Sequence, residues 1–311
     1  MSLTEEEPLS RILLIAPVGA YTGRVKTGID SVISGESRRG KTRIIVKLVA
    51  GEDWMQDPNY RTDFAEKLQK EITKTWKTDY PDITCEIVEL PMKSEQYLSG
   101  WLLGESSRFL QQDILGSVFI DLTSGPREWE FAAIDTTNFF ESVEVYYIKA
   151  TNQKSPSKYG RDALDHGNPK RETVRTGESR LIEWLTPKAA NGDLNFQFEL
   201  FRFIYNWAKE IVKPTTQEKL WDVNIPIETD AGLTKYRDAF RARTGTFRKP
   251  IPIPKDNDKL QKSISKYIAK VDMFKLFVRT SKKSRSIRLT QKGAMLAESL
   301  FESRDLKIEK A

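Results

Sequence analysis

The chain has 311 residues, of which 39% are hydrophobic and 30% are charged, and its net charge is +6. This length allows two domains with separate cores. A single cysteine, Cys85, excludes an internal disulfide framework, and a single histidine, His166, excludes a metal site of several histidines. The apolar run at residues 12–16 is far too short to span a membrane, so we expect a soluble, cytoplasmic protein.

The N-terminal half alternates short apolar runs with segments of helical length. Strands are predicted at residues 11–16, 42–49, 83–90, 118–122 and 143–148. Helices are predicted between them at residues 25–33, 58–77 and 97–114, with one more at 129–140. Strands that alternate with helices imply right-handed crossovers. The sequence therefore predicts an α/β fold with a Rossmann-like, mostly parallel sheet.

The functional argument depends on the stretch from Val118 to Arg127. An apolar run ends at Asp121, and small hydroxyl residues, Gly125 and a proline follow before a helical pattern begins. This pattern indicates a strand end, a tight loop and a helix N-terminus, where backbone N–H groups attract anions. Ligands of such sheets bind at the carboxyl ends of the strands, where the strand order reverses. This turn and the loop at residues 17–24 are the two candidates for that position.

Common nucleotide and catalytic motifs are either missing from the sequence or lie in the wrong structural context. The first loop has Gly19, Gly23 and Gly28, which do not form the GxGxxG spacing of a dinucleotide site. The string GxxxxGK[ST] occurs once, at residues 35–42, but it leads into the predicted strand at 42–49, whereas a P-loop follows a strand and opens a helix, so a P-loop nucleotidase is not supported. The GxSxG motif does not occur, which argues against an α/β-hydrolase. We therefore expect no resident cofactor and no metal, and the sequence assigns no catalytic residue.

The C-terminal half has a different hydrophobic period. Residues 151–177 are polar and are predicted to form a long loop, followed by a strand at 181–185. A boundary at residues 187–193 divides the chain into domains 1–186 and 187–311. The second domain is predicted to have helices at 196–212, 215–221, 258–271 and 290–300 and a hairpin at 275–289.

This order of helices followed by a basic hairpin is typical of a winged helix-turn-helix domain. Residues 226–254, which are framed by prolines, are interpreted as an insertion within it.

The positive charge is concentrated in the second domain. Residues 234–292 contain 18 lysine and arginine residues and 4 acidic residues, a net charge of +14, which leaves −8 for the rest of the chain. Such clustering is expected of a nucleic-acid-binding surface, although a run of lysines is more often only the solvated face of a helix. We predict contacts to double-stranded DNA from Lys259, Lys262, Lys266, Lys270, Lys282, Lys283, Arg285 and Arg288.

The turn from Asp121 to Arg127 resembles the second motif of CRISPR-associated Rossmann-fold (CARF) domains, in which a strand ends in Asp-x-Thr-small-Gly-x-basic. A CARF domain followed by a winged helix is a known arrangement, and the resemblance covers residues 11–300. The family's loop more often has a second glycine where Ser124 stands and a threonine where Pro126 stands.

The resemblance implies a homodimer that binds a cyclic oligoadenylate, most simply cyclic tetra-adenylate, in antiviral defence. The helix N-termini and an arginine suit its phosphates. Carried over to this sequence, the ligand-binding residues are Tyr21, Thr22, Arg24, Thr123, Ser124, Gly125 and Arg127. The alternative is a purely structural role, in which these residues only close turns and cap helices.

Three functions remain open from the sequence. The first is a dimeric DNA-binding regulator that responds to cyclic oligoadenylate. The second is a metal-independent ring nuclease of the same family, with a lysine such as Lys154, Lys158 or Lys170 stabilising developing charge. The third is a protein-interaction module without DNA binding, which the basic segment argues against.

Overall fold

The computed structural model describes residues 10–19, 22–37, 42–51, 58–92, 94–112, 116–149, 170–177, 196–212, 219–244, 256–272, 275–279 and 285–302. The chain divides into two compact units. The first unit comprises Met1–Leu102 and Arg108–Arg180, and the second comprises Leu103–Ser107 and Leu181–Ala311.

The first unit contains a six-stranded sheet in the order β3-β2-β1-β4-β5-β6. Its strands are β1 (Ser10–Pro17), β2 (Thr42–Gly51), β3 (Thr84–Leu90), β4 (Ser117–Asp121), β5 (Val143–Lys149) and β6 (Lys170–Thr176). The first five strands are parallel, and β6 pairs antiparallel with β5. The strand order runs outward in both directions from the neighbouring pair β1 and β4. This confirms the predicted mostly parallel α/β sheet and locates its switch point between these two strands.

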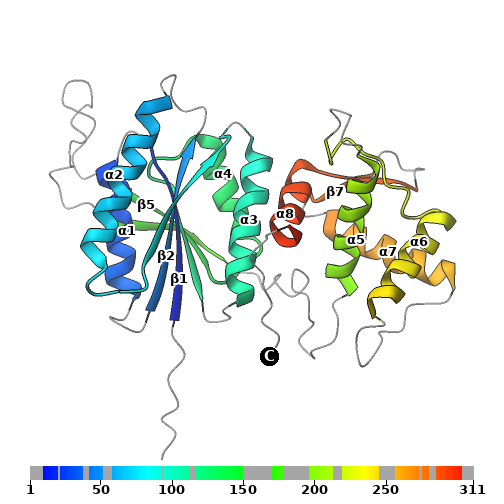
Figure 1. Ribbon diagram of the computed structural model, residues 1–311. Helices are drawn as coiled ribbons and strands as arrows, with labels where there is room; N and C mark the ends of the chain where they lie inside the picture. The colour runs from blue at the N-terminus through cyan, green and yellow to red at the C-terminus, as the bar shows by residue number, and fades with distance from the viewer. Residues whose placement is uncertain are drawn as a thin grey trace, which may run out of the picture. The chain divides into compact units, whose positions relative to one another are not determined.

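Helices cover both faces of the sheet. They are α1 (Thr22–Glu36), α2 (Pro58–Trp76), α3 (Glu95–Gln112) and α4 (Arg127–Thr136). Figure 1 shows α1 and α2 on one side of the sheet and α3 and α4 on the other. The central strands are buried on both faces because of this, so β1 reads as a continuous apolar run from Ile12 to Ala16 rather than as an alternating pattern.

The prediction of a loop at residues 151–177 was wrong for residues 170–176, which form β6 at the edge of the sheet. The sequence of this strand, KRETVRT, has one aliphatic residue, so its composition did not indicate a strand. An edge strand needs only one hydrogen-bonded neighbour, and here polar side chains attach it. Arg171 forms an ion pair with Glu36 at 2.7 Å, and its guanidinium lies over the rings of Phe119 and Tyr146. The Tyr147 hydroxyl donates to Glu172.

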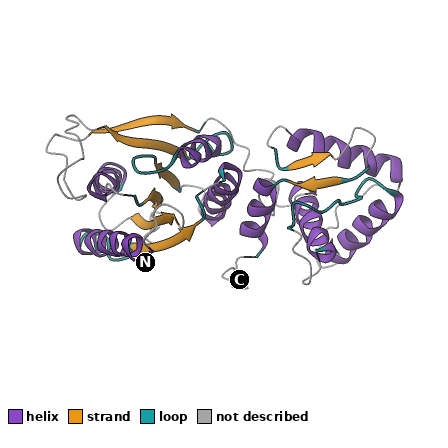
Figure 2. Cartoon of the chain, turned by 90° about the horizontal axis from the view of Figure 1, so that it is seen from above, coloured by secondary structure: helices purple, strands orange, loops and turns teal. Residues whose placement is uncertain are grey.

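Among the residues that the structure describes, the second unit contains four helices and a hairpin. They are α5 (Phe196–Ile211), α6 (Asp230–Thr244), α7 (Asn257–Asp272) and α8 (Gln291–Phe301), with strands β7 (Phe277–Arg279) and β8 (Ile287–Leu289). The antiparallel hairpin is widened by a bridge between Ile225 and Ile287 and lies against the helices (Figure 2). Aromatic residues dominate its core, where Phe201 meets Phe277 edge-on at 5.7 Å.

The predicted helix at residues 215–221 and the insertion at 226–254 were both wrong within the described residues. Residues 219–222 form a turn, whereas α6 begins at Asp230. The Thr229 hydroxyl accepts a hydrogen bond from the Gly232 N–H and caps α6. Leu233, Tyr236 and Phe240 then recur at helical spacing and are buried. The sequence contains this N-cap and this periodic apolar face, but the prolines on either side of the helix led to the prediction of an insertion instead. The predicted strand at 181–185 lies outside the described residues.

Candidate functional site

The two candidate ligand loops leave the sheet side by side. Because β1 and β4 are parallel neighbours, with Ile15 opposite Ile120, their carboxyl ends lie at the same edge. The loop after β1 leads into α1, and the loop after β4 leads into α4. Both helix N-termini therefore begin at this edge, as the sequence predicted.

Asp121 is the buried centre of the second loop. It is 0% exposed, and its Oδ1 accepts a hydrogen bond from the Thr123 N–H at 2.6 Å. Its Oδ2 has no hydrogen-bond partner among the described residues, and neither has the buried Tyr146 hydroxyl nearby. Burial raises the pKa of Asp121 to about 7, against the opposing effects of the Thr123 hydrogen bonds and of the nearby Tyr146 hydroxyl. The protonated and ionised forms of this buried carboxyl group therefore have similar free energies near neutral pH.

The approach of α1 to this carboxyl depends on a glycine. A Cβ atom at Gly28 would lie 2.8 Å from Asp121 Oδ2 and 3.0 Å from Tyr146 Cε2. Only a residue without a side chain allows this contact. Gly28, which does not belong to a dinucleotide fingerprint, packs the helix of the first loop against the acid that orders the second.

The second loop is tied to both of its neighbours. The Thr123 hydroxyl accepts a hydrogen bond from the Ile148 N–H at 3.0 Å, which fixes the loop to β5. The Trp129 indole N–H donates to the Asp121 carbonyl at 2.8 Å, which fixes it to α4. A Cβ atom at Gly125 would lie 2.5 Å from Trp129 Cδ1, so the indole covers the loop closely. The Ser124 Oγ is buried and has no partner in the described part of the chain.

Arg127 begins α4 and is exposed. Its guanidinium lies 5.3 Å from the centre of the Phe131 ring, and Phe131 is 45% exposed. Sequence reasoning missed Phe131, although its position four residues after an arginine was a usable signal. Glu128 and Glu130 stand in the same helical turn. The two carboxylates stabilise the N-terminus of α4, but they also weaken the attraction of its backbone amides for an anion. Arg127 is therefore the residue of this turn that attracts a phosphate.

In the first loop, Thr22 and Arg24 lie in the first turn of α1 and are partly buried. Tyr21 lies outside the described residues. The sheet order thus brings Thr22 and Arg24 to the same edge as Thr123, Ser124, Gly125 and Arg127.

The second unit presents a basic face on α7. Its buried face consists of Leu260, Ile264, Tyr267 and Ile268, and its exposed residues include Lys259, Lys262 and Lys266. On β8, Arg288 is half-buried, and the preceding Arg285 is exposed. The side chain of Lys270 lies outside the described residues, as do Lys282 and Lys283. Of the residues predicted to contact DNA, those that the structure describes therefore lie on α7 and on or next to β8.

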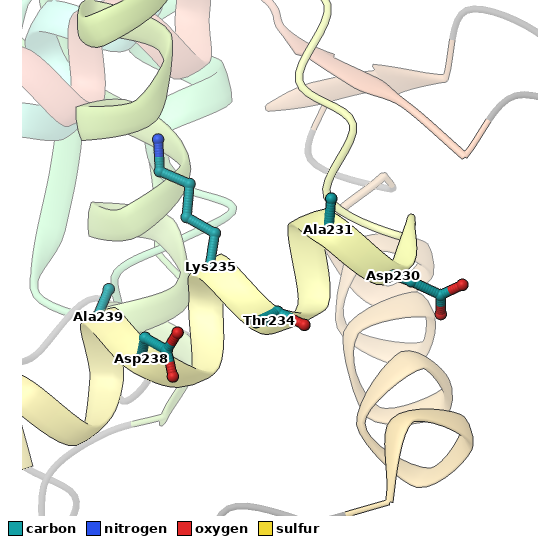
Figure 3. Close-up of a pocket in the computed structure, with 6 residues that line it drawn as sticks. All are labelled: Asp230, Ala231, Thr234, Lys235, Asp238 and Ala239. Atoms are coloured by element: carbon teal, nitrogen blue, oxygen red, sulfur yellow. The ribbon is translucent and has the colours of Figure 1, made fainter.

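The α6 helix has a different surface. Figure 3 shows Asp230, Thr234 and Asp238 along one side of this helix, where they line a surface hollow. Lys235 points towards α5, where its ammonium contacts Glu210 and lies 4.7 Å from the centre of the Trp207 ring. One helix face lines this hollow and its exposed carboxylates repel phosphates, so it does not fit the predicted ligands.

Other candidate groups have structural explanations. Cys85 packs against the core of the sheet, and burial raises the pKa of its thiol to about 12, so it is not a nucleophile at neutral pH. Within the described ranges, no cluster of three or more histidine, cysteine or acidic residues is able to hold a metal ion. No helix among the described residues is long and apolar enough to cross a membrane.

A scan against protein-family models and a search of the curated proteins found no match. Among solved structures, the chain is similar to Enterococcus italicus Csm6, in its complex with cyclic hexa-2'-fluoro-hexa-dAMP, at a TM-score of 0.35 and 9% sequence identity. The match covers 86% of this chain and 57% of the Csm6 chain, so this chain spans a little over half of that protein. The fold described above rests on strand order and register and not on this likeness.

Proposed function

We propose that this protein is a dimeric DNA-binding regulator that responds to a cyclic oligoadenylate. In this proposal the first unit is a CARF-like sensor, and the second unit is a winged helix that binds double-stranded DNA. The observation that carries the proposal is the basic face of α7, whose Lys259, Lys262 and Lys266 are exposed while Leu260, Ile264, Tyr267 and Ile268 of the same helix are buried.

The order of elements in the second unit supports the winged-helix assignment. A helix, a bridging segment at Ile225, two further helices and a hairpin follow one another, and the bridge joins the hairpin to form a small sheet. In this arrangement α7 is the helix that enters the major groove and the hairpin is the wing. The lysines then contact phosphates, which provide affinity and positioning without sequence specificity.

The turn at the switch point supports the sensor assignment. The second loop combines the Asp121-x-Thr-Ser-Gly-x-Arg127 motif with a helix N-terminus at the carboxyl edge of the sheet. A two-fold arrangement of two chains would present this loop twice to a cyclic ligand that itself repeats. The ligand changes DNA binding only through its different affinities for two arrangements of the dimer.

The DNA-binding half of the proposal is tested by titrating a labelled duplex of mixed sequence at several salt concentrations. Contacts to about six phosphates would give a log–log salt slope of about −5. Absence of salt-dependent binding to any duplex would reject DNA binding and favour a protein-interaction module.

The sensing half is tested by calorimetric titration with cyclic tri-, tetra- and hexa-adenylate, and by repeating the duplex titration with the ligand that binds. Arg127→Ala should weaken ligand binding. Arg43→Ala is the matched control, because Arg43 is exposed at the opposite edge of the same sheet. Ligand binding that leaves duplex affinity unchanged would reject the coupling but not the two binding activities.

A second candidate function is a metal-independent ring nuclease. Lys149 and Lys170 face each other at the end of β5 and the start of β6, one residue from the Ile148 amide that holds Thr123. A cation there could stabilise charge while a ribose 2'-hydroxyl attacks the adjacent phosphorus, forming a 2',3'-cyclic phosphate and releasing the 5'-oxygen as a hydroxyl. Intact cyclic tetra-adenylate after hours with the protein and EDTA would reject this candidate.

A further inference from the structure

A buried carboxylate lies behind the basic face of the second unit. Glu228 is 3% exposed and stands between the bridge at Ile225 and the start of α6. Its Oε2 accepts a hydrogen bond from Arg279 Nη1 at 3.0 Å, and its Oε1 accepts from Arg279 Nη2 at 2.9 Å. Oε1 also accepts from the Ser265 hydroxyl at 2.7 Å, and the Glu228 N–H donates to the Arg285 carbonyl at 3.1 Å.

These contacts join every described element of the proposed DNA-binding surface. Ser265 lies on α7 between Lys262 and Lys266, and Arg279 is the last residue of β7. Arg285 precedes β8 at the other side of the hairpin. One carboxylate and its own backbone amide therefore contact the helix and both sides of the hairpin.

The geometry of this contact differs from that of the surrounding core. The packing of α7 on the hairpin is apolar, as in the contact of Tyr267 with Phe277 at 6.3 Å between ring centres. Apolar packing has little directional preference, so it does not by itself prevent a helix from turning or sliding. A bidentate arginine–carboxylate pair is planar and directional, and it fixes both partners.

Stability is a weak explanation for the pair. Burial of the Glu228 carboxylate costs solvation free energy, which offsets much of its attraction to Arg279, whose side chain is 37% exposed, and apolar residues often stabilise such a site as well or better. A directional group at the junction of three elements is better explained by the arrangement that it imposes. Two guanidinium nitrogens of Arg279 bond to Glu228, although the Arg279 side chain stays 37% exposed.

We propose that Glu228 is a positioning residue, which holds the basic face of α7 and the hairpin in the relative orientation that binds DNA. This inference rests on the proposed function of the second unit. It predicts that loss of the carboxylate weakens DNA binding, even though removing a negative charge should strengthen it through long-range attraction.

The test compares Glu228→Gln with Glu199→Gln in the full-length protein. Glu199 is a matched control, because it is also buried (4% exposed) and pairs with Arg202 on its own helix α5, at 3.4 Å. Both substitutions remove one negative charge from the same unit. Duplex affinity is measured by titration, and hydrogen exchange is measured at the amides of α7, β7 and β8.

We expect Glu228→Gln to bind the duplex about tenfold more weakly than Glu199→Gln, with faster exchange confined to α7 and the hairpin. Equal or tighter binding by Glu228→Gln would overturn the inference, because charge alone would then explain the result. If the wild-type protein does not bind DNA, the proposed function fails and the positioning role in DNA binding fails with it. If hydrogen exchange in Glu228→Gln is then still faster only in α7 and the hairpin, Glu228 holds these elements together but has no role in DNA binding.

A second pair of variants keeps the test decisive if Glu228→Gln does not fold. Ser265→Ala removes one hydrogen bond to the carboxylate, whereas Ser263→Ala removes an exposed hydroxyl that bonds the Lys259 carbonyl of the same helix. Weaker duplex binding by Ser265→Ala than by Ser263→Ala supports the inference, and equal binding contradicts it.

Discussion

The two units each bury one acid beneath a candidate binding surface, and the two acids are held in different ways. In the first unit Asp121 accepts a hydrogen bond from a neighbouring N–H, and its Oδ2 has no partner among the described residues. In the second unit Glu228 receives both guanidinium nitrogens of Arg279 and a serine hydroxyl. The first acid is close to its point of ionisation, and the second belongs to a directional ion pair.

This difference indicates how each surface can respond to a ligand. A buried carboxyl group with one unpartnered oxygen can change its hydrogen bonds or its protonation at a small cost in free energy. Such a group suits a loop that rearranges when a ligand binds. A bidentate pair resists rearrangement, which suits a surface that must keep its shape when it binds a rigid duplex. The following predictions test this contrast, from the largest expected effect to the smallest.

Replacing Lys259, Lys262 and Lys266 together with glutamate should weaken duplex binding on the order of 10³-fold, because three phosphate contacts become repulsive. With alanine instead, the magnitude of the log–log salt slope should fall by about 2 to 3. The matched control reverses three exposed lysines of the first unit, which are Lys70 and Lys74 on α2 and Lys77 directly after it. Equal losses in both triple variants would show that the attraction is general and does not belong to α7.

The stability of the first unit should depend on pH through Asp121. Its pKa is raised from 3.8 to about 7, so between these values only the unfolded chain has released the proton. The free energy of unfolding should therefore fall as the pH rises from about 4 to about 7, and this contribution should level off above that. Asp121→Asn lacks this loss, so its stability relative to wild type should improve by about 3 kcal/mol between pH 5 and pH 8.

Hydrogen exchange at amides of β1 and β4 measures this difference, because it reports on the first unit separately. Parallel pH profiles for Asp121→Asn and the wild-type protein would contradict the prediction.

Gly28→Ala should destabilise the first unit by about 2 kcal/mol, because the added methyl group overlaps Asp121 Oδ2 and Tyr146. Gly35→Ala on the same helix is the control. A Cβ atom there meets nothing within 4 Å, so this substitution should be neutral or stabilising by up to about 1 kcal/mol. Urea unfolding of both variants distinguishes overlap at Gly28 from a general effect of alanine on α1, since the two should shift in opposite directions.

Ser124→Ala should have the smallest effect. The Oγ has no partner among the described residues, so its removal should leave the thermal stability of the free protein unchanged or slightly higher. If the hydroxyl contacts a bound ligand, the variant should bind cyclic tetra-adenylate about tenfold more weakly by calorimetry. Unchanged affinity would mean that Ser124 only fills the turn.

The regular part of the fold could be predicted from the sequence because its signals are local. Five strands and four helices of the first unit were predicted within a few residues, since strands buried on both faces are continuous apolar runs and helices repeat every three to four residues. The parallel order then located the turn at Asp121 at the edge of the sheet, and the apolar period of residues 258–271 predicted α7.

The remaining features depend on residues that meet only after folding. The edge strand β6 has a polar sequence and is attached through Arg171 to Glu36, which is 135 residues away. Glu228 and Arg279 are 51 residues apart, and no local spacing connects them. The raised pKa of Asp121 likewise follows from burial beneath α1 and not from its sequence neighbours. The sequence alone determined which segments become helices and strands, because each buries a local apolar face. Tertiary structure decided the partners of buried charges, because low-dielectric surroundings form only when distant segments pack together.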